Sequence, residues 1–255
     1  MKPLQITEKN LSVAWARGFL DLMGPDGSQR HPATVTINDI ERQSDIEIAA
    51  IRGRLDTELK DRRDSLCATV AGTLFPISMW NPTLPDNADA LYKRYAKAWP
   101  KIAKCPANRK GVYFQRLTAF SPLGFTGEAV NQLEFIVETY RGGNHRKSAL
   151  QAAILDPTRD HTDNRQKGFP CLQQVSFTPL KNDRLSITGY YATQYHFEKA
   201  YGNYLGLYRL GRFMAHQLDM QLTQVVCVAS VVSLGNTSKS QLQLLCDDMH
   251  RLISN

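Results

Sequence analysis

The sequence predicts an α+β protein in which a mostly antiparallel sheet has helices packed on one face. Residues 172–179 and 185–191 alternate between apolar and polar side chains, and a short polar connection makes them a hairpin. Apolar residues then recur at every third and fourth position over 197–218, which indicates a long, largely buried helix. The valine-rich stretch 223–234 is typical of a core strand. Ser240 is expected to cap a last amphipathic helix.

The first part of the chain carries shorter patterns. Residues 8–23 place their apolar side chains on one face of an expected helix, and Gly24 opens the turn that follows. Residues 33–40 alternate like a strand. Residues 65–75 are apolar and are expected to form a helix that ends at Pro76, because proline has no N–H to continue the ladder.

Two more helices are expected in the middle of the chain. Residues 86–104 and 128–140 both have apolar side chains in helical phase, and Pro100 is expected to kink or end the first of these helices. Residues 148–155 are expected to form a strand, and residues 156–168 a polar loop.

Length and composition limit the class of protein. No repeat divides the 255 residues, so residues 1–255 are expected to form a single domain. The net charge of +7 favours an anionic partner, but no basic and aromatic stripe is present, so nucleic acid is an unlikely one. No stretch approaches the ~20 apolar residues of a membrane span. The polar start shows no signal peptide, and the odd count of five cysteines favours reduced thiols in the cytoplasm. No metal-ligand spacing is present, so no metal is expected.

Four short segments between residues 108 and 235 occur in an informative order. The pair Pro170–Cys171 precedes the expected hairpin, and Asn203 follows it in the long helix. Upstream are residues 111–117, GVYFQRL, and residues 144–147, NHRK. In this order they resemble the thymidylate synthase superfamily, and the surroundings of Asn203 are similar to its deoxypyrimidine hydroxymethylase branch. The resemblance implies a thymidylate synthase-like fold and transfer of a methyl or hydroxymethyl group to C5 of a pyrimidine nucleotide or related substrate, with 5,10-methylenetetrahydrofolate as donor.

The resemblance assigns catalytic roles to Cys171 and Tyr113 and substrate binding to Asn203. A thiolate that adds to C6 of a pyrimidine makes C5 nucleophilic, and a nearby phenol can manage protons. A side-chain amide can donate to a ring oxygen and accept from the ring N–H, which favours uracil. Simple structural roles are the alternatives: Cys171 as a small buried residue, Tyr113 as a core aromatic, and Asn203 bonded to nearby backbone.

The resemblance also assigns a phosphate site. Arg146 and Lys147 match a basic pair that reaches across the family's dimer to the substrate phosphate, and Thr193 matches a serine that binds the same group. A basic loop in solvent is the alternative reading of Arg146 and Lys147. A homodimer formed through the sheet face is therefore expected, and the apolar residues 225–232 agree with it.

Several family residues are missing. Ala192 and Tyr195 stand where the family has an arginine and an aspartate, and Leu172 stands where a histidine often follows the nucleophile. Residues 230–235 lack the family's His-x-Tyr, and residues 65–85 contain no acid. Two interpretations remain open: an enzyme refitted to a different substrate, or a catalytically degenerate pseudoenzyme that binds a nucleotide or a partner.

Overall fold

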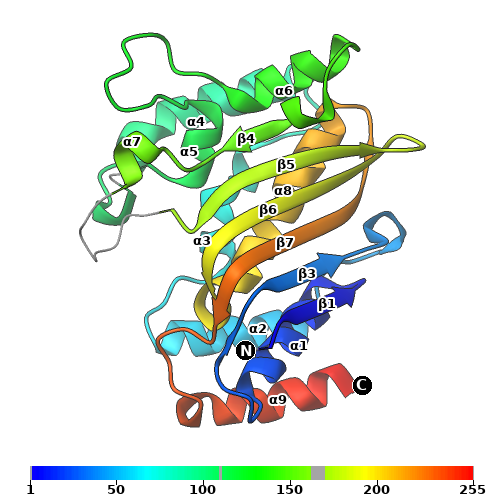
Figure 1. The fold of residues 1–255 in the computed structure, drawn as a ribbon, viewed down its shortest axis with the longest axis vertical. Helices are drawn as coiled ribbons and strands as arrows, with labels where there is room; N and C mark the ends of the chain where they lie inside the picture. The colour runs from blue at the N-terminus through cyan, green and yellow to red at the C-terminus, as the bar shows by residue number, and fades with distance from the viewer. Residues whose placement is uncertain (1, 109–110, 162–169, 255) are drawn as a thin grey trace.

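The computed structural model describes residues 2–108, 111–161 and 170–254 (Figure 1). The expected polar loop 156–168 lies partly outside these residues, and its described part contains the short helix α7 (Pro157–Asp160). Within the described ranges, every helix is too short or too polar to cross a bilayer.

A seven-stranded sheet forms the centre of the described structure. Its order is β1-β3-β7-β6-β5-β4, and the short β2 also pairs with β7. The β1–β3 and β6–β7 pairs are parallel and the other pairs are antiparallel, which confirms a mostly antiparallel sheet. The strands are β1 (Leu4–Glu8), β2 (Gln29–Arg30), β3 (Ala33–Ile37), β4 (Gln151–Ala153), β5 (Leu172–Leu180), β6 (Arg184–Tyr195) and β7 (Gln221–Ser233).

Helices cover one face of this sheet. The long helix α8 (Tyr201–Gln217) runs behind β5, β6 and β7 in Figure 1, and α1 (Leu11–Met23) and α3 (Cys67–Leu74) pack against it. A Cβ atom at Gly189 of β6 would lie 2.8 Å from the Leu207 side chain, so glycine allows the helix to approach the strand closely.

No described helix covers the opposite face, which is the front face in Figure 1. Thr188 pairs with Val226, and Tyr190 with Val228, in the parallel register of β6 and β7. Alternate residues of a strand lie on the same face, so these four side chains form adjoining rows. Tyr190 is 41% exposed and the other three are half-buried, which leaves an open, largely apolar surface.

The expected central helices are present with small shifts at their ends. They are α4 (Asn87–Ile102) and α6 (Gln132–Arg141). Pro100 lies inside the last turn of α4, so of the two expected outcomes, a kink or an end, the helix does not end at Pro100. Ala96, four residues earlier, is exposed, and water can replace the hydrogen bond that proline cannot donate.

The last two helices begin differently from the sequence pattern. A π-helical turn, His196–Ala200, leads into α8. The final helix, α9 (Gln243–Ser254), follows a 3₁₀ turn, Ser240–Leu242. Ser240 therefore does not cap this helix, because it lies inside the turn and Lys239 occupies the capping position.

Two strands are shorter than the sequence pattern predicts. Two further helices lack the clear apolar periodicity that would have predicted them. β4 covers part of residues 148–155, because Lys147–Ala149 forms a 3₁₀ turn before it. β3 ends before residue 40, since Asp39 has a positive φ of 52°. The helices without a signal are α2 (Ala49–Asp61) and α5 (Tyr113–Thr118).

Candidate functional site

Cys171 presents an exposed thiol immediately before β5. Its carbonyl accepts a 2.8 Å hydrogen bond from the backbone N–H of Ala192, which fixes this end of β5 beside β6. Three other cysteines, Cys67, Cys227 and Cys246, are buried. Cys105 is a second exposed thiol that the sequence argument did not distinguish.

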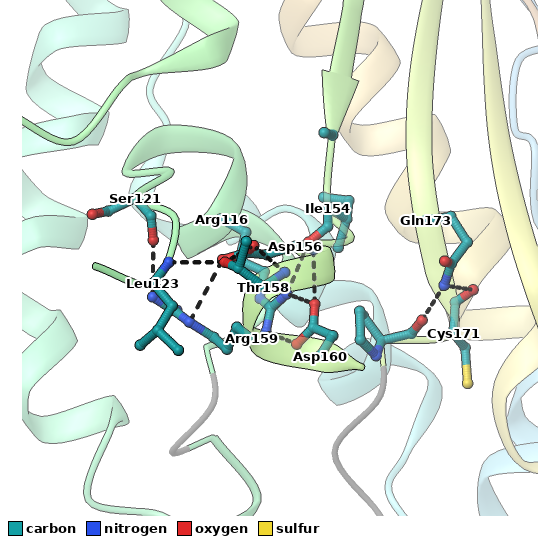
Figure 2. Close-up of polar contacts among 12 residues, drawn as sticks. Arg116, Ser121, Leu123, Ile154, Asp156, Thr158, Arg159, Asp160, Cys171 and Gln173 are labelled. Atoms are coloured by element: carbon teal, nitrogen blue, oxygen red, sulfur yellow. Dashed lines mark hydrogen bonds and ion pairs between the residues drawn. The ribbon is translucent and has the colours of Figure 1, made fainter. Parts of the chain in front are cut away.

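The hydroxyl of Thr193 faces the candidate nucleophile. Its Oγ1 lies 3.8 Å from Cys171 Sγ, and Thr193 is exposed near the end of β6. Figure 2 shows the Cys171 sulfur directed away from Gln173, whose amide donates to the carbonyl oxygens of Pro170 and Cys171. The structure thus brings together two of the residues predicted from the sequence.

Tyr113 contacts the backbone that carries the thiol. It begins α5, is half-buried, and its hydroxyl interacts with the backbone of Cys171 and Leu172. Burial raises the pKa of Tyr113 above the usual tyrosine value, and the nearby Cys171 adds to the rise. The phenol therefore stays protonated at neutral pH and can act as a hydrogen-bond donor.

A second tyrosine behind the thiol was not predicted. Tyr191 of β6 is 2% exposed, and its buried hydroxyl has no hydrogen-bond partner among the described residues. Burial raises its pKa well above the usual value, with smaller contributions from Cys227 and Tyr113. Strand alternation alone places Tyr191 on the helix-covered face, so the sequence could predict that it is buried, but not that it lies near the thiol.

Asn203 occupies the first turn of α8 and is 4% exposed. Its side-chain amide makes no hydrogen bond to any described residue, so the local backbone bonds of the simple alternative are not formed. An amide with unused donor and acceptor atoms remains able to bind an imide ring. No contact between described residues joins Asn203 to Cys171.

Arg146 and Lys147 are exposed and lie at the far end of the sheet from Cys171. Gln151 pairs with Ser176 in the antiparallel β4–β5 register, so the segment before β4 lies beside the end of β5. Cys171 precedes the start of β5, and at ~3.3 Å per residue the length of that strand separates the two by roughly 30 Å. Within one chain, this basic pair does not join Thr193 in a phosphate site.

A buried ion pair beside the site was also missed. Arg116 of α5 holds Asp160 of α7 with two hydrogen bonds, of 2.5 and 2.8 Å, and donates to the Ile154 carbonyl at 2.9 Å (Figure 2). Burial alone raises a carboxyl pKa, but these hydrogen bonds outweigh it and lower the pKa of Asp160. The pair ties the helix that carries Tyr113 to α7.

His196 has a structural role. It is fully buried, its Nε2 lies 2.9 Å from the Trp15 carbonyl, and its ring stacks on Trp15. Burial lowers the pKa of His196 to about 4, so it is neutral at physiological pH. A Cβ atom at Gly18 would lie 2.5 Å from the ring, which leaves no room for a ligand there.

The charges expected around a thymidylate synthase thiol are not formed by the described residues. No described charged side chain hydrogen-bonds the Cys171 thiol, and Ala192 offers only its backbone. The donor that the resemblance implies, 5,10-methylenetetrahydrofolate, stays a prediction, because the contacts at Cys171 concern only the thiol and its backbone. In the described part of the chain, no group of three or more His, Cys, Asp or Glu side chains is placed to hold a metal ion.

No protein family model matches this sequence, and no curated protein shows significant similarity to it.

Proposed function

We propose that this chain is a cytoplasmic, thymidylate synthase-like transferase that acts at C5 of a pyrimidine nucleotide or related substrate through Cys171. The observation that carries the proposal is the exposed Cys171 thiol, which faces the Thr193 hydroxyl at 3.8 Å. The phenol of Tyr113 against the backbone of Cys171 and Leu172 also supports it.

The residues suit a covalent mechanism. The Cys171 thiolate adds to C6 of the pyrimidine, forming an S–C6 bond and an enolate that makes C5 nucleophilic. C5 then attacks the carbon of a one-carbon electrophile, and the electron pair displaced from that carbon goes to its own oxygen or leaving group. Loss of the C5 proton regenerates the enolate, and expulsion of the thiolate restores the ring. Tyr113, kept protonated by its raised pKa, is suited to hold a water molecule or a proton near this carbon. The side-chain amide of Asn203, which has no hydrogen-bond partner among the described residues, is suited to bind the imide edge of uracil.

Ordinary methylation of deoxyuridylate is expected to be weak or absent. Each missing charged contact is typically worth about 1.5 to 3 kcal/mol. The absence of an arginine at Ala192 and of an acid in residues 65–85 therefore corresponds to on the order of a hundredfold in rate or more. We accordingly propose an altered pyrimidine substrate and leave methylenetetrahydrofolate as one arm of the assay.

A homodimer belongs to the same proposal. The uncovered sheet face with Val226 and Val228 supports this, because a C2 dimer buries the same apolar patch of both chains. Only a partner chain could bring Arg146 and Lys147 to the Thr193 end of the site, given their place in the β4–β5 register. Light scattering should give the mass of a dimer at micromolar concentration. A nucleotide dissociation constant unchanged by joint alanine substitution of Arg146 and Lys147 would contradict the shared phosphate site.

The decisive experiment measures exchange at C5. Tritium release is followed from C5-tritiated pyrimidine nucleosides and nucleotides, with and without methylenetetrahydrofolate. We expect exchange that Cys171→Ala abolishes and Cys105→Ala preserves, since Cys105 is the other exposed thiol. Exchange that survives Cys171→Ala refutes the nucleophile, and robust turnover of deoxyuridylate with folate shows that the missing residues are dispensable.

A pseudoenzyme is the second candidate. The observation in its favour is that no described charged side chain hydrogen-bonds the Cys171 thiol, whose only hydrogen-bond partner among the described residues is the Thr193 hydroxyl. A nucleotide that binds with unchanged affinity to wild type and Cys171→Ala, without C5 exchange in either, supports this alternative.

A further inference from the structure

A cavity of about 360 Å³ lies between α4 and α5. Tyr92, Tyr95 and Trp99 form its α4 wall, and their spacing puts all three on one side of that helix. Gln115 and Thr118 of α5 face them. The volume is near the lower end of the range for small-molecule sites, roughly 300 to 1,000 Å³. It suits a ligand of one or two fused rings.

This cavity is separate from the Cys171 site. Tyr113 directs its hydroxyl to the backbone of Cys171. Gln115 and Thr118 follow it by two and five positions, so at ~100° per residue they project from the opposite side of α5. The cavity therefore opens on the side of α5 that faces away from the proposed nucleophile.

The cavity offers mainly aromatic surface. The Thr118 hydroxyl already donates to the Phe114 carbonyl at 2.9 Å, and the Gln115 amide donates to the Ala119 carbonyl at 3.2 Å. The Tyr95 and Trp99 rings are stacked, with centroids 6.2 Å apart and planes 26° apart. Trp99 is half-buried, so a flat ring can extend this stack without first breaking a hydrogen bond.

The mouth of the cavity is basic. Lys93 lines it, is 76% exposed, and pairs with Asp89 at 2.6 Å. Lys97 and Lys101 follow on α4 at four-residue spacing and are exposed. Asp86 and Asp89 lie near Lys93, and Glu134 lies near Tyr92, so the three lysines are partly balanced. Lys97 and Lys101 form no ion pair with a described residue, and the row still attracts an anion to this side of the helix.

We propose that the α4–α5 cavity binds a planar aromatic small molecule that carries a negative charge. The ring lies against Tyr92 and Trp99, and the charged group points to Lys93 at the mouth. This site is additional to the proposed pyrimidine chemistry and does not require Cys171.

The test uses a matched pair of probes in ligand-observed NMR titrations of the full chain. 2-Naphthoate is planar and anionic, and its decahydro analogue keeps the carboxylate and carbon skeleton without the flat ring. We expect 2-naphthoate to bind at about 0.1 to 1 mM, a usual strength for a fragment of this size. The decahydro analogue should bind about three- to tenfold more weakly, because it cannot stack. No binding of 2-naphthoate, or equal binding of the two probes, overturns the proposal.

Variants locate the site and its charge. Ala96 is exposed and lines the cavity, so Ala96→Trp should fill it and abolish binding, whereas Ala50→Trp on the exposed surface of α2 should not. Lys93→Gln should weaken 2-naphthoate about threefold and leave the neutral 2-naphthamide unchanged. Cys171→Ala should bind like wild type, which separates this site from the proposed enzymatic one. Binding that survives Ala96→Trp, or an equal loss in Ala50→Trp, refutes this location.

Discussion

Asp160 and Glu198 are both buried carboxylates, but their surroundings differ. Asp160 on α7 receives two hydrogen bonds from the Arg116 guanidinium of α5. Glu198, in the π-helical turn before α8, accepts one 2.8 Å bond from the backbone N–H of Asn236, and its other oxygen is unpaired among the described residues. No described residue forms an ion pair with Glu198.

The difference shows how a fixed cation reverses the effect of burial on the pKa of a carboxyl group. Burial favours the neutral form of any carboxyl group. At Asp160 the Arg116 hydrogen bonds outweigh burial and the pKa is lowered, whereas at Glu198 burial dominates and the pKa is raised. The α5–α7 contact is therefore a buried ion pair, and the loop after β7 encloses a carboxyl group that is easily protonated.

Removing the cation should give the largest effect. Arg116→Ala leaves Asp160 as a buried charge without its partner, and this typically lowers the free energy of unfolding by about 3 to 5 kcal/mol. Arg159→Ala is the control, because Arg159 is partly exposed: it loses a 3.8 Å pair with Asp156, worth at most about 1 kcal/mol, and one hydrogen bond to the Ser121 carbonyl. Its effect on Asp160 is smaller than that of Arg116, so its loss of stability should be the smaller one. Urea denaturation measures both. Equal losses in the two variants would contradict the distinction.

Crowding the Glu198 carboxylate should give the second-largest loss of stability. Gly235 has a φ of +125°, and a Cβ atom there would lie 1.8 Å from Glu198 Oε2. Gly235→Ala should lower the free energy of unfolding by about 1 to 3 kcal/mol through backbone strain, and further through this clash. Gly143→Ala isolates the strain, since its φ is +78° and its Cβ would meet nothing within 4 Å. A variant at Gly235 no less stable than that control would show that the loop moves freely away from Glu198.

The two carboxylates should give opposite pH dependences. A raised folded pKa means that the contribution of Glu198 is present below the ordinary glutamate pKa and is lost as pH rises through the folded value. The lowered pKa of Asp160 means that its contribution is present above the ordinary aspartate pKa and is lost as pH falls. Urea midpoints from about pH 4 to 8 should therefore fall less with rising pH in Glu198→Gln than in wild type. Parallel curves would show that Glu198 titrates normally.

The smallest expected change in the free energy of unfolding concerns a neutral group, the buried Tyr191 hydroxyl. Tyr191→Phe removes a buried hydroxyl that has no described partner, so it should stabilise the fold by up to about 1 kcal/mol. Tyr204→Phe is the counterpart, since the Tyr204 hydroxyl donates to Gln194 Oε1 at 3.4 Å. That variant should lose about 0.5 to 1.5 kcal/mol. A loss of stability in Tyr191→Phe would show that its hydroxyl has a partner after all, such as an ordered water.

The fold was predictable where periodicity is strong. The β5–β6 hairpin and α8 combine regular alternation with a long buried stripe, so local pattern and tertiary packing agree. β1 escaped notice because a strand from Leu4 to Glu8 is short, and its partner β3 lies beyond α1. α5 is a single short helix whose apolar residues show no clear period.

The site was less predictable because its contacts span long distances in sequence. Cys171 and Thr193 lie close together because the β5–β6 hairpin brings them side by side, so the sequence could indicate this contact. The pairing of Arg116 with Asp160 joins residues with no common local pattern, and only the folded chain brings them together. The distance of Arg146 from Cys171 depends on the antiparallel register of β4 with β5, which the order of motifs does not reveal.

The position of β7 within the sheet has a consequence for synthesis on the ribosome. β7 lies between β3 and β6, yet it is the last strand of the described chain to leave the tunnel. At ~5 to 20 residues per second, β3 waits roughly 10 to 40 seconds for this partner. During that interval, β3 has one edge open to other nascent chains. A chaperone that shields residues 33–37 until β7 emerges would protect the molecule at the time when it is most prone to aggregate.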